Sequence, residues 1–166
     1  VHTLFRNENL GCKQAVSSAI TWFFRHVEAG IILEDDCVPH HTFFPYCAEL
    51  LERYQHDERI MTISGNNFQP DDREYDHSYY FSAYMHCWGW ATWRRAWKKY
   101  DGEIPTWQQL RNTPWLRHWL RGNAAEAYWT EVFDRVAEGE LDSWAYLWTF
   151  ACWREHALHV LPSVNL

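Results

Sequence analysis

Three adjacent carboxylates, Glu34, Asp35 and Asp36, are the residues of this chain best suited to chemistry. They follow an apolar run at residues 30–33, and Pro39 stops the segment soon after them. A short β-rich run that ends in acids predicts a buried strand that delivers charge to the rim of a sheet. Neighbouring carboxylates repel one another, so they favour a bound cation or a surrounding rich in hydrogen-bond donors. The alternative is that Asp35 and Asp36 simply cap the helix that follows.

The segments around this triplet predict alternating helices and strands. Apolar residues recur at helical spacing over residues 13–29 and 42–54, and Gly30 is expected to end the first helix. Residues 59–64 alternate as a strand and lead directly to Asn66. This order predicts an α/β fold with a mixed, mostly parallel sheet flanked by helices. The triplet and Asn66 would then meet at the carboxyl edge of the sheet, where open α/β sheets bind ligands.

The second half of the chain is expected to be mainly helical. Residues 79–84 predict a strand and residues 92–99 a helix. Residues 106–139 predict helices with breaks at Pro114 and at the Gly122-Asn123 pair, and residues 157–161 predict a closing strand. Before the last helical run stands Asp142, at or near an N-cap, a role that would by itself explain this residue.

Two further segments suit a ligand, although each has an ordinary structural explanation. Asn9, Gly11 and Lys13 precede or open a helix, where free N–H groups and a cation could hold a diphosphate, or where the helix is simply capped. The sequence Trp88-Gly89-Trp90 lets the backbone and ring faces approach a ligand, or it forms a buried aromatic turn.

Composition narrows the function classes. The net charge of −7, without a basic block, argues against nucleic-acid binding. Five cysteines without zinc-finger spacing favour a reducing, cytoplasmic setting. We expect no transmembrane segment, while attachment at the inner face of a membrane stays open. Twelve tryptophans suit either sugar-binding surfaces or an aromatic core. The length of 166 residues suits one domain, and a start without Met suggests a piece of a longer chain.

Five segments taken together resemble a known family. They lie at residues 9–11, 30–36, 63–67, 87–93 and 142–144. Their types and order resemble the GT-A fold glycosyltransferases, the nucleotide-diphospho-sugar transferase superfamily, and in particular a bacterial branch with a Glu-Asp-Asp motif. The order of the triplet, a Gly-Trp segment and a later acidic segment is similar to that of N-acetylglucosaminyltransferase I. The resemblance covers nearly the whole chain.

The resemblance implies a metal-dependent, inverting transferase that moves a hexosyl or N-acetylhexosaminyl group from a nucleotide-diphospho-sugar donor to a hydroxyl of a carbohydrate or glycan acceptor. Asp36 would coordinate Mn²⁺ or Mg²⁺, a hard cation that prefers oxygen ligands and offsets the charge of the leaving diphosphate. Glu34 and Asp35 would contact the donor. Asp142 would be the general base that takes the proton of the acceptor hydroxyl.

The remaining site residues implied by the resemblance would bind the donor or shape its pocket. They are Asn9, Gly11, Lys13, Asn66, Trp88, Gly89 and Trp90. Residues 1–166 would form a single, partial GT-A domain, with the metal motif at 34–36 and the acceptor and sugar side at 79–166. The half that grips the nucleotide base is expected upstream of Val1.

Two other functions stay open at this point. The first is a non-catalytic sugar- or partner-binding domain on the same fold, because fold does not fix function. The second is a metal-dependent hydrolase that uses the triplet with His40 or His41, which would require these side chains to converge on one metal. The donor nucleotide, the sugar, the acceptor and the oligomeric state are not encoded in these patterns.

Overall fold

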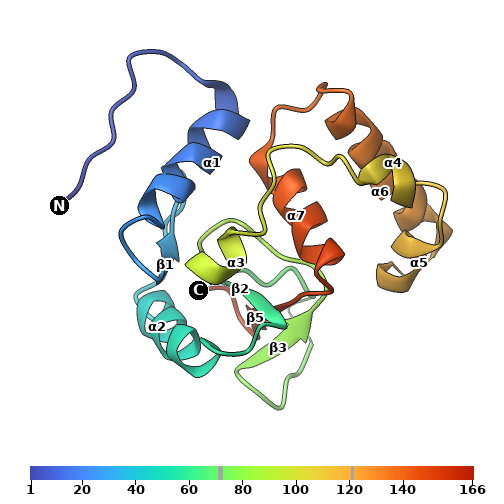
Figure 1. Ribbon diagram of the computed structural model, residues 1–166. Helices are drawn as coiled ribbons and strands as arrows, with labels where there is room; N and C mark the ends of the chain where they lie inside the picture. Colours follow the sequence, from blue (N-terminus) through green and yellow to red (C-terminus); the bar gives the residue numbers. More distant parts are fainter. Residues whose placement is uncertain (71–72, 121) are drawn as a thin grey trace.

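The protein, described by a computed structural model over residues 1–70, 73–120 and 122–166, is a mixed α/β structure built on a five-stranded sheet (Figure 1). In chain order the elements are α1 (Gly11–Phe23), β1 (Ala29–Ile32), α2 (Phe43–Arg53), β2 (Ile60–Ser64), β3 (Tyr79–Ser82), β4 (Trp90–Trp93), α3 (Arg94–Trp97), α4 (Trp107–Leu110), α5 (Trp115–Trp119), α6 (Asn123–Ala137), α7 (Trp144–Arg154) and β5 (Leu158–Pro162). No helix in the part that the structure describes is long and apolar enough to cross a membrane.

The strand order in the sheet is β1-β4-β2-β5-β3. Only β2 and β5 pair in parallel, whereas β4 runs antiparallel to both β1 and β2, and β3 runs antiparallel to β5. The prediction of a mostly parallel sheet is therefore wrong. Strands β3 and β4 are reached through loops rather than through crossover helices, and such connections permit antiparallel pairing. Strands β1, β2 and β5 still point the same way.

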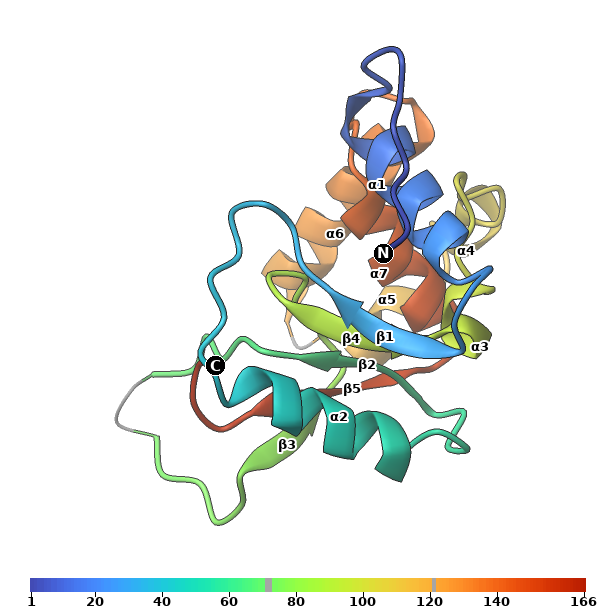
Figure 2. The same cartoon turned by 90° about the vertical axis from the view of Figure 1, so that its left-hand side faces the viewer.

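The sheet is covered on both faces (Figure 2). On one face α1 and α7 pack against Met61, Trp90 and Trp97. On the other face α2 packs through Phe43, with Ile63 of the sheet beneath it. Alternate residues of β4 therefore serve opposite cores, as the two-residue repeat of a strand requires.

A third core lies between α7 and the helices α4, α5 and α6, which gather beside α7 on the side away from α1 (Figure 1). Its centre consists of the fully buried rings of Trp107, Phe133 and Trp153. The predicted breaks at Pro114 and Gly122 separate these three helices, so the helical reading of residues 106–139 is confirmed.

Two local predictions fail near the sheet. Gly30 does not end a helix, because α1 stops at Phe23 and Gly30 pairs with Thr92 inside the sheet. The absent side chain there lets the Phe23 ring lie directly on the strand. The helix predicted for residues 92–99 begins later, since residues 92 and 93 belong to strand β4 and α3 starts at Arg94. Two neighbouring strands supply the hydrogen bonds of β4, and these override local propensity.

Candidate functional site

The acidic triplet, the Asn66 loop and the Trp88 loop leave the sheet at one edge. Trp90, the first residue of β4, pairs with Ile32 at the end of β1 and with Ser64 at the end of β2. Each of the three segments therefore leaves its strand beside the other two. The prediction that the triplet and Asn66 share the carboxyl edge is confirmed, although an antiparallel strand, β4, lies between their strands.

A backbone contact between two glycines holds this edge closed. The Gly65 N–H donates to the Gly89 carbonyl at 2.8 Å. Gly89 has a φ of +75°, a conformation that side chains other than hydrogen rarely adopt, and a Cβ there would touch Leu33 and Phe43. Gly89 is therefore favoured for its backbone conformation, since the space around it would accept a Cβ at ordinary contact distances.

The triplet carries concentrated negative charge. Glu34 is half-buried, and its pKa is raised by that burial, by Asp36 and by Asp35. Asp35 and Asp36 are exposed. None of the ion pairs found within residues 1–70, 73–120 and 122–166 involves these three carboxylates. Such a surface attracts a cation, and oxygen donors suit Mg²⁺ or Mn²⁺.

The triplet does not extend into a complete set of protein ligands. Among the described residues, no three His, Cys, Asp or Glu side chains are grouped so that they could hold a metal ion. The His40 ring hydrogen-bonds to Thr42 Oγ1 at 2.8 Å, and its centroid lies 4.0 Å from that of the tilted His41 ring. A cation at the triplet would therefore need ligands beyond the described side chains, such as the waters that Mg²⁺ usually keeps.

Asp142 caps a helix, but a distant one. Its two carboxylate oxygens accept the backbone N–H groups of Cys12 at 2.8 Å and Lys13 at 3.1 Å. These are donors of the first turn of α1, 130 and 129 residues away in sequence. Asp142 makes no cap on α7, whose N-cap is Ser143. The Asp142 carboxylate therefore binds the helix N–H groups that were predicted to be free for a diphosphate.

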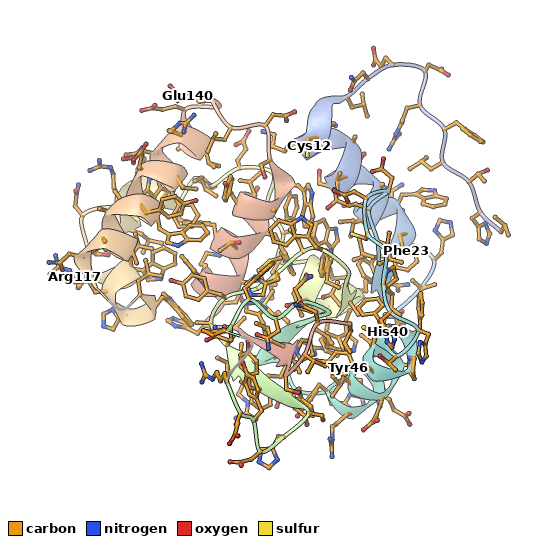
Figure 3. All side chains as sticks on the ribbon, turned by 180° about the vertical axis from the view of Figure 1, so that it is seen from behind. Cys12, Phe23, His40, Tyr46, Arg117 and Glu140 are labelled. Atoms are coloured by element: carbon orange, nitrogen blue, oxygen red, sulfur yellow. The ribbon has the colours of Figure 1, made fainter. Side chains whose placement is uncertain are left out.

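Gly11 makes this cap possible. Its φ is +73°, and a Cβ at this position would lie 2.5 Å from Asp142 Oδ2. The Asn9 side chain accepts the Gly11 N–H at 2.9 Å, so Asn9 closes the loop before α1. Asn9 and Gly11 are thus used in the loop itself. Lys13 contributes only its backbone N–H to the cap, so its side-chain charge is not used in these contacts. Figure 3 shows Cys12 in this first turn, beside the segment that leads into α7.

Two thiols in the site segments have raised pKa values. Burial raises the pKa of Cys12, and the Glu34 and Asp142 carboxylates raise it further. Burial raises the pKa of Cys87 to about 12, with smaller contributions from Glu34 and Asp36. The geometry links these segments in two pairs: hydrogen bonds hold Asp142 against the first turn of α1, and strand pairing places the triplet beside the Trp88 segment.

The two asparagines after β2 differ in their surroundings. Asn67 is almost buried: its side chain donates to the Ser163 carbonyl at 2.7 Å, and its oxygen accepts the Tyr80 hydroxyl at 3.1 Å. It is a structural residue. Asn66 is half-buried, and its side-chain oxygen has no hydrogen-bond partner among the residues described. Because this oxygen is itself enclosed by protein, the unpaired acceptor is a local cost of the fold, and it is not open to a ligand in this structure.

The two tryptophans of the Trp-Gly-Trp segment have opposite roles. Trp88 is 53 % exposed at the edge. Trp90 is fully buried and stacks on Trp144 with ring centroids 5.6 Å apart. The expectation that Trp90 contacts a donor therefore needs correction: its ring belongs to the core, Gly89 is buried beside it, and within this segment only Trp88 is exposed.

Comparisons with protein-family models, with curated proteins and with solved structures find no match for this chain. Its function must be argued from the site.

Sequence reasoning missed residues that the fold brings to this site. The sequence assigns no role to Cys12 and includes Cys87 only as the first residue of the segment 87–93, yet burial and the Glu34 carboxylate raise the pKa of both thiols. Phe68, which is 60 % exposed and contacts Trp88, was not singled out. One signal was available: Phe68 is a large apolar residue placed directly after an Asn pair in a polar loop.

Proposed function

We propose that this protein is a metal-dependent, inverting glycosyltransferase related to the GT-A superfamily, and that it transfers a sugar from a nucleotide-diphospho-sugar to an acceptor hydroxyl in the cytoplasm. The observation that carries the proposal is the meeting of the acidic triplet, the Asn66 loop and the exposed Trp88 segment at one edge of the sheet. Asp142, more than 100 residues later in the sequence, is fixed by the first turn of α1. A cation-binding carboxylate cluster and a separate carboxylate base are the two acidic parts that such a reaction needs.

Asp36, exposed at the tip of the triplet, would hold the cation, and Glu34 and Asp35 would add negative charge around it. When bound, the cation supplies Lewis-acid stabilisation of the diphosphate that leaves. Lys13, in the first turn of α1, would offer a positive charge to the diphosphate. The exposed ring of Trp88 would border the sugar.

Asp142 would accept the proton of the acceptor hydroxyl as that oxygen attacks the anomeric carbon. A carboxylate offers about four lone-pair sites, and the N–H groups of Cys12 and Lys13 use two of them. The two backbone donors fix the carboxylate in place, and its exposed side remains open to a hydroxyl. One base with no separate nucleophile implies inversion of the anomeric centre.

The direct test is a screen of the protein against a panel of nucleotide-diphospho-sugars, with EDTA, Mn²⁺ or Mg²⁺, measuring release of the nucleoside diphosphate. We expect turnover that requires the cation and that falls by about 10²-fold or more in Asp36→Ala and in Asp142→Asn. Asp76→Ala, at an exposed acid in the loop before β3, is the matched control and should keep full activity. Turnover in EDTA, or full activity in both site variants, would refute the proposal.

A non-catalytic sugar-binding domain is the second candidate, and one observation favours it. Asp142 has a complete structural role as the cap of α1, so its presence does not require catalysis. This candidate predicts saccharide binding that survives EDTA and Asp142→Asn, without release of nucleoside diphosphate from any donor.

A further inference from the structure

Two large aromatic side chains are exposed side by side at the edge that carries the triplet. Phe68 is 60 % exposed and Trp88 is 53 % exposed. Their ring centroids are 5.6 Å apart and their planes meet at 86°, so the rings form a corner. Because burying such rings is strongly favourable, a pair left in solvent marks a surface with another use.

The backbone behind both rings is fixed. Asn67, next to Phe68, donates its N–H to the Asn165 side chain at 2.7 Å and receives the Gln69 N–H at 2.9 Å. Gly89, next to Trp88, accepts the Gly65 N–H. His86 supports Phe68 from one side, with ring centroids 4.7 Å apart at 90°. The corner is therefore preorganised, and a ligand would lose little binding energy in ordering it.

Exposed acceptors lie at the same edge as the corner. Asp35 and Asp36 are exposed, and they follow β1, whose last residue, Ile32, pairs with Trp90 just after Trp88. An exposed ring face with hydrogen-bond acceptors at the same edge suits a pyranose, which has an apolar C–H face and a periphery of hydroxyl donors.

We propose that the exposed face of Trp88 stacks on the C–H face of a pyranose ring, with Phe68, at right angles to it, as the side wall of the same platform. This inference rests on the proposed function for the identity of the sugar, which is either the transferred sugar of the donor or the terminal residue of the acceptor. The platform itself requires only sugar recognition, and it adds Phe68 to the site.

The test is a titration of the ¹⁵N-labelled protein with methyl pyranosides of glucose, galactose and N-acetylglucosamine in EDTA, and with the matching nucleotide sugars and nucleoside diphosphates in Mn²⁺. Phe68→Leu and Trp88→Leu keep apolar bulk but lose the aromatic face, and each should weaken sugar binding by about threefold to tenfold. Phe68→Tyr and Trp88→Phe should restore it. Tyr128→Leu, an equally exposed aromatic on α6, is the control and should have no effect.

The two sources of the sugar give different results. If the platform serves the acceptor, the protein binds methyl pyranosides in EDTA. If it serves the donor, the protein in Mn²⁺ binds the nucleotide sugar more tightly than the nucleoside diphosphate, and the Leu variants lose this difference in affinity. If Leu variants weaken the nucleoside diphosphate alone by the same factor, the platform holds a nucleobase and the inference is wrong. It is also wrong if the Leu variants bind every probe as the wild type does. If the Leu variants weaken sugar binding but the protein releases no nucleoside diphosphate from any donor, the platform is supported and the proposed transferase activity is wrong.

Discussion

The helical cluster of α4, α5 and α6 and the edge that carries the triplet treat the same residue types in opposite ways. In the cluster, Asp134 accepts from Trp107 and Arg111, and Glu126 pairs with Arg117. The rings at the centre of the cluster, Trp107 and Phe133, are fully buried. At the edge, Asp36 has no ion-pair partner within the described residues.

This contrast separates residues that stabilise the fold from residues kept for binding. Paired charges and buried rings add stability, whereas crowded carboxylates and exposed rings reduce it. A protein retains the second arrangement where it serves a ligand. Substitutions that are matched between the two regions should therefore affect different measurements.

The largest difference is expected between two tryptophans. Trp153 is fully buried and donates its indole N–H to the Ala83 carbonyl at 2.7 Å. Trp153→Ala should lower the free energy of unfolding by about 3–5 kcal/mol, whereas Trp88→Ala should change it by less than about 1 kcal/mol. Urea denaturation of both variants measures this. Equal losses would mean that Trp88 is part of the core.

The second comparison concerns two aspartates. The Arg111 guanidinium, with the Trp107 indole N–H, holds the pKa of Asp134 below its usual range. Asp134→Ala leaves a buried indole donor without its partner and should cost about 2 kcal/mol. Asp36→Ala should leave stability unchanged or slightly higher, because it relieves repulsion within the triplet. Thermal unfolding without divalent cations checks both, and a large loss in Asp36→Ala would contradict the contrast.

Asp142 stands between the two classes, since it has both a structural partner and a proposed chemical role. Asp142→Ala should cost about 1 kcal/mol, the usual value of an N-cap. Asp142→Asn keeps one acceptor oxygen and should cost less, while it removes the base. Comparing unfolding midpoints with donor turnover separates the two roles. If both variants lose stability and activity in the same proportion, Asp142 is only a cap.

The smallest effect is a pH dependence at Glu34. Its raised pKa means that the folded protein binds this proton more tightly than the unfolded chain does. Stability should therefore fall as the pH rises from the ordinary value of 4.5 through the raised value, and the full penalty applies above it. Glu34→Gln should be more stable than the wild type at pH 7 and equal to it at pH 3 in thermal unfolding. A Glu34→Gln variant that is less stable at pH 7 would contradict the cause given for the shift.

The sequence predicted most local elements, because their signals are local. The helical stripe of residues 42–54 became α2, and the alternation of residues 59–64 became β2. Strand β4 was not predicted, since Trp90–Trp93 shows no distinctive alternation and is fixed by the strands on either side. The antiparallel direction of its pairing could not be predicted either, because strand direction depends on long-range contacts.

The site was predicted in part. The meeting of the triplet with Asn66 followed from strand order, and it needed only the shared direction of β1 and β2. The contact of Asp142 with α1 could not be foreseen, since it joins residues 130 positions apart. The burial of Trp90 was equally hidden, because residues on either side of Gly89 look alike in sequence and differ only in their place in the fold.

The insertion of β4 between β1 and β2 also governs when the site can form. Strands β1 and β2 are not direct neighbours, because β4 lies between them. The edge therefore forms only when Trp90–Trp93 has paired with both strands. Closing such long loops is slow compared with forming the helices. During refolding, α2 and α6 should gain structure before the triplet and Asn66 come together. The site is thus a late product of folding, and it appears in a single step with the central strand of its edge.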